Sequence, residues 1–170
     1  EDRVAVKPHA SPVFHAIQYL SGLQTKEKIQ NFRGFGGAQS YPSRTKDIDD
    51  VDISTGSVGL GVAMTSFISL IQDYVARKKF YKNKPLGRMI ALVGDAELDE
   101  GNVYECLQEG WKHDLRNVWW IIDYNRQSLD GVVHEGLSER LSSVFSAFDC
   151  NLVVLKYGKL QEESFKEPGV

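Results

Sequence analysis

The sequence lacks long apolar runs, an excess of basic residues and closely spaced cysteines, and each absence excludes a class of protein. The apolar runs of the 170-residue chain are far too short to span a bilayer, so we expect no membrane segment. The formal net charge is −3, and no basic stripe with interleaved aromatic residues is present. Nucleic acid is therefore not expected as a partner.

Cysteine is scarce, and its placement argues against a metal-thiolate site. The two cysteines, Cys106 and Cys150, lie far apart without metal-ligand spacing. We expect two reduced, buried thiols, which is typical of a cytoplasmic protein. The chain begins at Glu1 with neither an initiator Met nor a signal-type apolar stretch, so we expect part of a longer chain or complex.

What the sequence does contain is an alternation of strand-like and helix-like segments. Apolar content of 42% and a length of 170 residues suit one globular domain, which we expect over 1–170. A Gly-, Ser- and Asp-rich stretch over 33–56 predicts a long loop. The predicted strands are 3–7, 88–94, 117–123 and 151–158, and the predicted helices are 11–22, 57–80, 97–114 and 135–148. This order predicts an α/β fold, a doubly wound parallel sheet with helices on both faces and nearly continuously apolar strands buried on both sides.

Three polar residues follow directly after predicted strands. In a doubly wound sheet, ligands bind beyond the carboxyl ends of the strands, which places His9, Asp95 and Asn125 at one edge. A carboxylate, an amide oxygen and a backbone carbonyl suit Mg²⁺, which commonly completes its shell with phosphate oxygens. The glycine-bounded helix start "TGSVGLG" (55–61) and the helix start after Ala96 both offer backbone N–H groups to an anion.

The acidic residues after Asp95 have two interpretations. Glu97, Asp99 and Glu100 fall in a predicted first helical turn, where the macrodipole favours acids. Glu97 also follows directly on the predicted metal loop, so a contact with the bound group is the alternative for this residue.

Two of these segments together carry a family resemblance. "GDAELDEG" (94–101) and "DYNRQ" (123–127) resemble the thiamine diphosphate motif of transketolase-like enzymes. The resemblance implies that Mg²⁺ is bound by Asp95, Asn125 and the carbonyl of Gln127, with Gly94, Ala96 and Glu97 also at the cofactor. Ala96 departs from the motif, which usually has glycine there, and its methyl group would crowd the diphosphate.

Further segments resemble the same family nearly end to end. "KPHASPVFHAIQYL" (7–20) resembles the segment whose histidine points at the diphosphate and the substrate, which implies a catalytic role for His9. "STGSVGLG" (54–61) resembles the loop that touches the cofactor rings, implying contacts from Gly56 and Val58, and "SLDG" (128–131) resembles the end of the motif. The family gives no role for His15, which we expect to serve helix packing or to lie on the surface.

Two branches of the family remain open, together with two other classes. "NRQSLDG" and "SYPSRTK" resemble the homodimeric decarboxylating component of pyruvate dehydrogenase, whereas "STGS" and "SLDG" also match transketolase; we favour the first. The alternatives are ketol transfer between sugar phosphates, or a catalytically silent relative acting as an interaction subunit. A dinucleotide-binding oxidoreductase is disfavoured because "TGSVGLG" lacks the G-x-G-x-x-G spacing.

The resemblance covers only the diphosphate-binding half of such an enzyme. In the family a glutamate on a second, pyrimidine-binding domain activates the cofactor, and no segment here resembles that domain. We therefore expect a pyrimidine-binding domain in cis or in trans, in a homo- or heterodimer, with the partner surface near the loop 33–56. The implied substrate is a small 2-oxo acid or a ketose.

Overall fold

A computed structural model describes residues 2–47, 50–80, 85–128, 131–132 and 135–168. The chain forms two compact units, Glu1–His134 and Glu135–Val170, which are described separately. The first unit contains every residue of the candidate site.

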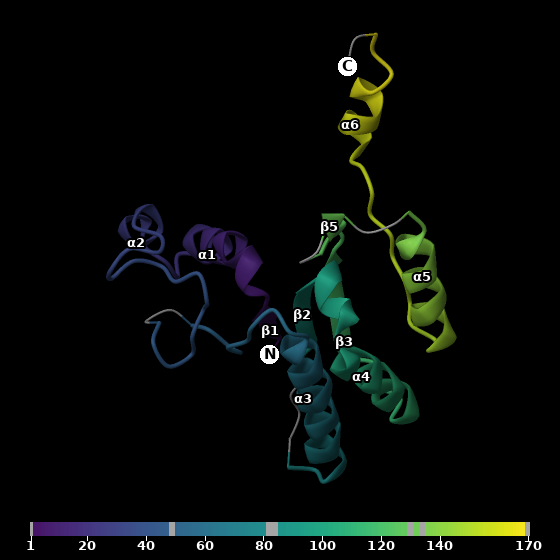
Figure 1. Ribbon diagram of the computed structural model, residues 1–170. Helices are drawn as coiled ribbons and strands as arrows, with labels where there is room; N and C mark the ends of the chain where they lie inside the picture. Colours follow the sequence, from purple (N-terminus) through teal and green to yellow (C-terminus); the bar gives the residue numbers. More distant parts are fainter. Residues whose placement is uncertain (1, 48–49, 81–84, 129–130, 133–134, 169–170) are drawn as a thin grey trace. The chain divides into compact units, whose positions relative to one another are not determined.

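The first unit is built on a parallel sheet. The strands β1 (Arg3–Val6), β2 (Met89–Gly94) and β3 (Val118–Asp123) lie in the order β1-β2-β3, as Figure 1 shows. All three strands run the same way, so their carboxyl ends lie at one edge. The α/β fold with a parallel sheet predicted from the sequence is confirmed.

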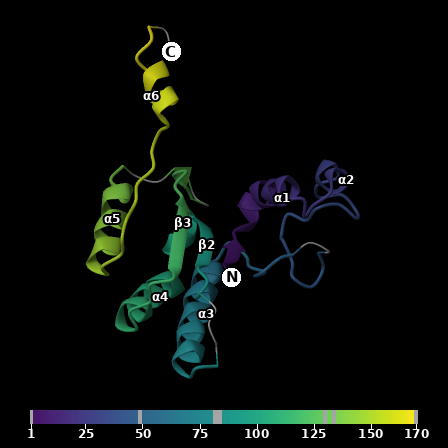
Figure 2. The same ribbon diagram turned by 180° about the vertical axis from the view of Figure 1, so that it is seen from behind.

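Two long helices lie beside this sheet. Helix α3 (Leu60–Arg77) packs on the strands, and α4 (Gly101–Lys112) packs on α3, so the two helices are side by side in the opposite views of Figures 1 and 2. The close approach of α3 depends on small residues, since a Cβ on Gly61 would lie 3.3 Å from the Ala5 Cβ. The core of this unit includes Ala5, Val62, Ala91, Val93, Leu98 and Val103.

Shorter elements complete the first unit. They are η1 (Pro8–Ala10), α1 (Ser11–Leu20), α2 (Lys26–Gln30), η2 (Asp95–Asp99), β4 (Gln127–Ser128) and β5 (Gly131–Val132), the last two forming an antiparallel pair. The predicted helix over 97–114 is thereby divided, because its first turn belongs to the 3₁₀ helix η2 and α4 begins at Gly101. The helix predicted over 57–80 is α3, shorter at both ends.

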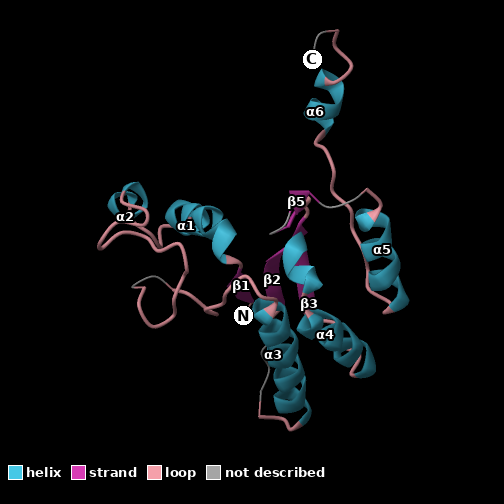
Figure 3. Cartoon of the chain, in the orientation of Figure 1, coloured by secondary structure: helices cyan, strands magenta, loops and turns pink. Residues whose placement is uncertain are grey.

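The predicted long loop is confirmed where it is described. Between 33 and 56, the described residues form turns and bends with no helix or strand, as the pink trace after α2 in Figure 3 shows. This loop is nevertheless tied to the sheet near its end. Ile53 forms a parallel bridge with Ala5, and the Val4 amide donates to Asp52 Oδ2 at 3.0 Å.

The strand β3 differs from the prediction of burial on both faces. Its side chains alternate between half-buried and exposed, and Trp119 and Ile121 are each 50% exposed. Among the described strands of the sheet, β3 is an edge strand that pairs with β2 alone. An edge strand has fewer neighbours to cover its side chains, which explains why an apolar run here is only partly buried.

The second unit contains α5 (Leu137–Ala147), as predicted, and the short helix α6 (Lys159–Ser164). The strand predicted over 151–158 is wrong, because these residues form no regular structure and their side chains are exposed. Val153 and Leu155 are apolar and β-prone, yet a strand requires a hydrogen-bonded neighbour, and these residues have no ladder partner among the described strands.

Two expectations based on scarcity have different outcomes. None of the helices in the described ranges combines the length and apolarity needed to cross a bilayer. Both thiols are free, but only Cys106 is buried, and the expectation of a buried Cys150 is wrong because this residue is exposed. Burial raises the pKa of the Cys106 thiol, and the neighbouring carboxylates of Glu105 and Glu109 raise it further.

Candidate functional site

Asp95 connects the end of β2 with the loop after β3. It follows β2 directly and is almost fully buried, with 3% of its surface exposed. Its Oδ2 accepts a hydrogen bond of 2.7 Å from the Arg126 amide, which lies just beyond β3. Arg126 has a left-handed backbone (φ 63°), so the chain turns sharply there toward the carboxylate. The expected proximity of the Asp95 and Asn125 segments is thereby observed.

Asn125 and Gln127 occupy the loop after β3. The Asn125 Oδ1 accepts from the Gln127 amide at 2.9 Å, a side-chain-to-backbone bond that fixes this turn. Both residues are exposed, and Gln127 begins β4. In the described part of the chain, no cluster of three or more His, Cys, Asp or Glu side chains suits a metal. A metal at this edge would therefore depend on amide and carbonyl oxygens beside Asp95. That all-oxygen set fits Mg²⁺.

The buried carboxylate of Glu97 hydrogen-bonds to two separate segments of the chain, and we call this pair of bonds the Glu97 clamp. Its Oε1 accepts from the Gly94 amide at 3.2 Å, and its Oε2 accepts from the Gly59 amide at 3.1 Å. These two bonds join the end of β2 to the start of α3. A buried carboxylate is tolerated here because backbone N–H groups satisfy both of its oxygens. The macrodipole of α4 does not explain Glu97, since that helix begins only at Gly101.

The glycine-rich loop before α3 is held close to α4. Gly59 has a left-handed backbone (φ 72°), and a Cβ there would lie 2.4 Å from Asn102 Oδ1. Asn102 in turn donates through Nδ2 to the Val58 carbonyl at 3.2 Å. The buried Ser57 Oγ has no hydrogen-bond partner among the described residues, which leaves this loop a donor for a ligand. Gly56, expected at the cofactor rings, is half-buried in the same loop.

A buried lysine crosses the strand ends and was not predicted. Lys7 follows β1, and its Nζ donates to Asp123 Oδ2 at 2.7 Å, with the lysine side chain 3% exposed and the aspartate 53% exposed. The ammonium packs over Gly94, because a Cβ built on that glycine would lie 3.3 Å from Nζ. The sequence shows only that Lys7 and Asp123 each stand at the end of a predicted strand; the pairing itself depends on the strand register, in which Gly94 lies beside Asp123.

His9 and His15 lie in consecutive helices, and they differ in burial. His9 lies in η1, just after β1, and is exposed. His15 is buried in α1, where its Nε2 contacts the Gln39 carbonyl at 2.7 Å and its ring packs edge-on against Phe14 and Phe32. The packing role expected for His15 is therefore what the structure has.

Two further residues expected at the cofactor, Ala96 and Val58, lie in the part of the chain that the structure describes. Ala96 is half-buried in η2, and its amide donates to Asp95 Oδ1 at 3.1 Å. Val58 is exposed on the glycine-rich loop. The end of the expected motif, at Leu129 and Asp130, lies outside the described residues. The structure thus gathers the segments around Gly56, Asp95 and Asn125 at one sheet edge.

Comparisons with known proteins agree with this arrangement. Residues 2–165 match the family described as transketolase, thiamine diphosphate binding domain. The chain is 28% identical over 157 residues to a transketolase of Staphylococcus aureus, covering 91% of this chain and 24% of the relative. It is also 28% identical over 165 residues to the pyruvate dehydrogenase E1 component of Mycolicibacterium smegmatis, covering 93% of this chain and 18% of the relative.

Solved structures show the same fold. The crystal structure of transketolase from Campylobacter jejuni superposes with a TM-score of 0.71 at 23% identity, covering 98% of this chain and 27% of that chain. The chain spans about a quarter or less of the length of the curated relatives it matches. Since the family match extends over nearly all of its residues, the chain belongs to the transketolase thiamine diphosphate-binding domain family.

Proposed function

We propose that this chain is the diphosphate-binding half of a thiamine diphosphate- and Mg²⁺-dependent enzyme acting on a small 2-oxo acid. The observation that carries the proposal is the bond between Asp95 Oδ2 and the Arg126 amide, which holds a buried carboxylate against the loop of Asn125 and Gln127. This arrangement supports an all-oxygen Mg²⁺ site at the carboxyl edge of a parallel sheet.

Each residue of the site has a defined task under this proposal. Asp95, Asn125 and the Gln127 carbonyl hold the metal, while the amides of the glycine-rich loop at Gly56 and Val58 contact the organic part of the cofactor. His9, exposed on η1, faces solvent where a substrate would arrive and carries the proton-handling role. When bound, thiamine diphosphate supplies the carbanion chemistry, so the protein is left to bind, orient and exclude water.

Two short motifs favour a 2-oxo acid as the substrate. "NRQSLDG" and "SYPSRTK" match the decarboxylating pyruvate dehydrogenase component, and one similar relative carries that name. Transketolase activity on sugar phosphates is the second candidate, favoured by the other named relatives and by the similar solved structures. A catalytically silent subunit remains the third, on the basis of Ala96 in the diphosphate loop.

A second domain is part of the proposal. Because the chain spans about a quarter or less of its relatives, the activating glutamate and the pyrimidine pocket would come from a further domain, in cis or from a dimer partner. The loop 33–56 is the proposed contact region, since its end is tied to β1 beside the site.

Calorimetry with the purified chain tests cofactor binding. Thiamine diphosphate should bind in the presence of Mg²⁺ and lose its affinity when EDTA removes the metal, while NAD should give no heat of binding. NAD binding without thiamine diphosphate binding would contradict the proposal. Absence of both, in a chain folded by circular dichroism, would favour the silent subunit.

Activity measurements test whether the chain carries only half of the active site, here called the half-site. The chain saturated with cofactor should neither decarboxylate pyruvate with an artificial electron acceptor nor transfer a ketol unit from a ketose donor. Adding a pyrimidine-binding domain should restore one of these two activities, and which one returns decides between the branches. Robust turnover by the chain alone would contradict the half-site.

A further inference from the structure

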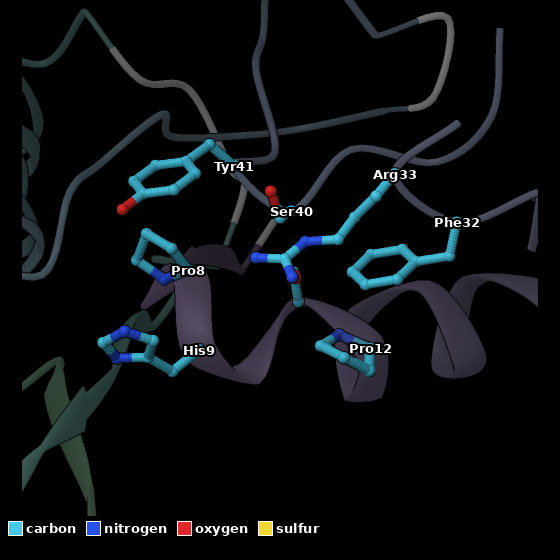
Figure 4. Close-up of a pocket in the computed structure, with 8 residues that line it drawn as sticks. Pro8, His9, Pro12, Phe32, Arg33, Ser40 and Tyr41 are labelled. Carbon is cyan, nitrogen blue, oxygen red and sulfur yellow. The ribbon is translucent and has the colours of Figure 1, made fainter. Parts of the chain in front are cut away.

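A cavity lies beside His9, between η1 with the start of α1 and the loop after α2. Its volume is about 270 Å³, and Figure 4 shows the side chains that line it. One wall is formed by η1 and the start of α1, and the other by the loop after α2. The lining residues are Pro8, His9, Ser11, Pro12, Phe32, Arg33, Ser40 and Tyr41. Among them is one guanidinium and no carboxylate.

Arg33 directs its charge into this cavity. Its backbone is left-handed (φ 68°), and its amide donates to the Ala38 carbonyl at 2.9 Å. Figure 4 shows the guanidinium between Ser40 and the first turn of α1. The guanidinium lies 5.9 Å from the Phe32 ring centroid and has no hydrogen bond or ion pair to any residue that the structure describes.

Ser11 adds an unpartnered donor. The residue is 1% exposed, and its Oγ has no hydrogen-bond partner in the described part of the chain. A buried hydroxyl without a partner is costly, and because Ser11 lines the cavity, a ligand bound there offers a partner for its Oγ. The hydroxyls of Ser40 and Tyr41 and the ring of His9 lie on the same cavity.

Internal hydrogen bonds hold the loop that carries Arg33, Ser40 and Tyr41. The buried His15 contacts the Gln39 carbonyl at 2.7 Å, and Gln39 donates through Nε2 to Asp47 Oδ1 at 2.9 Å. Ala38 is buried, and its amide donates to the Lys28 carbonyl at 3.0 Å. Ser40 directly follows Gln39, so these contacts set its position.

We propose that this cavity is an oxyanion site in which Arg33, Ser11 and Ser40 bind the charged end of the substrate. The guanidinium offers two parallel N–H groups to a carboxylate or phosphate, and the hydroxyls offer further donors. The inference rests on the proposed function in one respect. It takes His9, which lines this cavity and is also proposed to lie at the cofactor, as the residue between the bound anion and the reacting atoms. The anion is the carboxylate of a 2-oxo acid or the phosphate of a ketose phosphate.

Titration of the full chain with single anions tests the site without cofactor. The Nε–Hε resonance of Arg33 is followed by NMR while pyruvate or inorganic phosphate is added at constant ionic strength. Either anion should shift this resonance saturably, and the tighter of the two identifies the source of the anion. An Arg33 resonance that neither anion shifts overturns the proposal.

Variants show whether the effect belongs to Arg33. In Arg33→Gln, calorimetry should give a dissociation constant at least about tenfold higher for the bound anion, with Arg33→Lys intermediate because it keeps the charge without the fork. The matched control is Arg44→Gln, on the same loop, whose guanidinium bonds the Asp52 carbonyl at 3.4 Å. Equal affinity in Arg33→Gln and wild type, or an equal loss in Arg44→Gln, overturns the site.

The cofactor titration separates this inference from the proposed function. Arg33→Gln should bind thiamine diphosphate with Mg²⁺ as the wild type does, because Arg33 lines this cavity and is not among the residues proposed to hold the metal. Anion binding without cofactor binding would leave the oxyanion site standing and contradict the proposed function alone. A parallel loss of cofactor affinity in Arg33→Gln would overturn the separation of the two sites.

Discussion

At the end of β2, Asp95 and Glu97 are 3% and 6% exposed, and backbone amides bond both carboxylates. At the end of β3, by contrast, Asp123, Asn125 and Gln127 are exposed. The β3 side is held by groups outside it, since Asp95 accepts from Arg126 and Lys7 binds Asp123. The polar side chains at the end of β2 are thus buried and fully bonded, whereas those at the end of β3 are exposed to solvent.

This difference predicts unequal consequences for substitutions on the two sides. Buried, fully bonded polar groups fix a structure, whereas exposed loops open locally at low cost. Changes at the end of β2 should therefore alter both stability and ligand binding. Changes at the end of β3 should alter ligand binding with less effect on the fold.

The largest effect is expected for Asp95→Ala. It removes the proposed charged metal ligand and also the acceptor of the Arg126 amide, so Mg²⁺-dependent thiamine diphosphate affinity should fall at least about a thousandfold, or about 4 kcal/mol. Calorimetry measures this loss, and circular dichroism checks the fold. Asp99→Ala, exposed in the same 3₁₀ helix, is the matched control and should bind normally. Unchanged affinity in Asp95→Ala would remove this residue from the site.

The corresponding change on the β3 side is Asn125→Ala. It removes the proposed neutral metal ligand, an exposed amide, so cofactor affinity should fall about ten- to a hundredfold, or about 1.4 to 2.7 kcal/mol, with little change in stability. A loss as large as that of Asp95→Ala would break the contrast between the two strand ends.

Glu97→Ala should produce the largest loss of stability. Two buried amides, of Gly59 and Gly94, would lose a charged acceptor, so unfolding in urea should show a decrease of about 3 kcal/mol. Glu100→Ala, exposed at the start of α4, should change stability by less than about 0.5 kcal/mol. Similar decreases in both variants would show that Glu97 acts as a first-turn charge and not as a clamp.

The Lys7–Asp123 pair should respond differently to the loss of each partner. Asp123→Ala leaves a buried ammonium unpaired and should cost about 2 kcal/mol, whereas Lys7→Met fills the same space with an apolar chain and should change stability by less than about 1 kcal/mol. The half-exposure of Asp123 keeps the first figure modest. Urea unfolding of both variants gives the comparison. A larger loss of stability in Lys7→Met than in Asp123→Ala would contradict the expectation that an unpaired buried ammonium is the costlier change.

The smallest effect is expected for Ala96→Gly. Ala96 is not among the described residues with a left-handed backbone, so glycine would relieve no strain, and its benefit would come only from removing a methyl group beside the diphosphate. Cofactor affinity should rise up to about tenfold, or about 1.4 kcal/mol. Calorimetry in parallel with the wild type measures the gain, and weaker binding by the glycine variant would show that this loop does not need the geometry of the family motif.

Sequence patterns were informative where one element determined the outcome. The apolar runs predicted β1, β2 and β3, and the polar residues after them predicted which segments meet around Asp95 and Asn125. What remained hidden depends on contacts between elements. The Lys7 pair requires the register of three strands, and the Glu97 clamp requires the approach of α3 to the end of β2.

The wrong strand prediction has the same origin. Residues 151–158 have the composition of a strand, but composition does not supply a neighbouring ladder. The antiparallel pair β4–β5 was missed for the opposite reason, because each of its strands is two residues long and carries too little pattern to detect.

The clamp at Glu97 also links two motions that would otherwise be separate. Since one carboxylate holds the amides of Gly59 and Gly94, the start of α3 cannot swing away without leaving that anion half-bonded beside the strand end. The two amides should therefore exchange hydrogen for deuterium through one shared opening event, with protection that rises and falls together. A cofactor bound at the edge of the sheet would slow both exchanges by the same factor, although the two glycines lie far apart in the sequence.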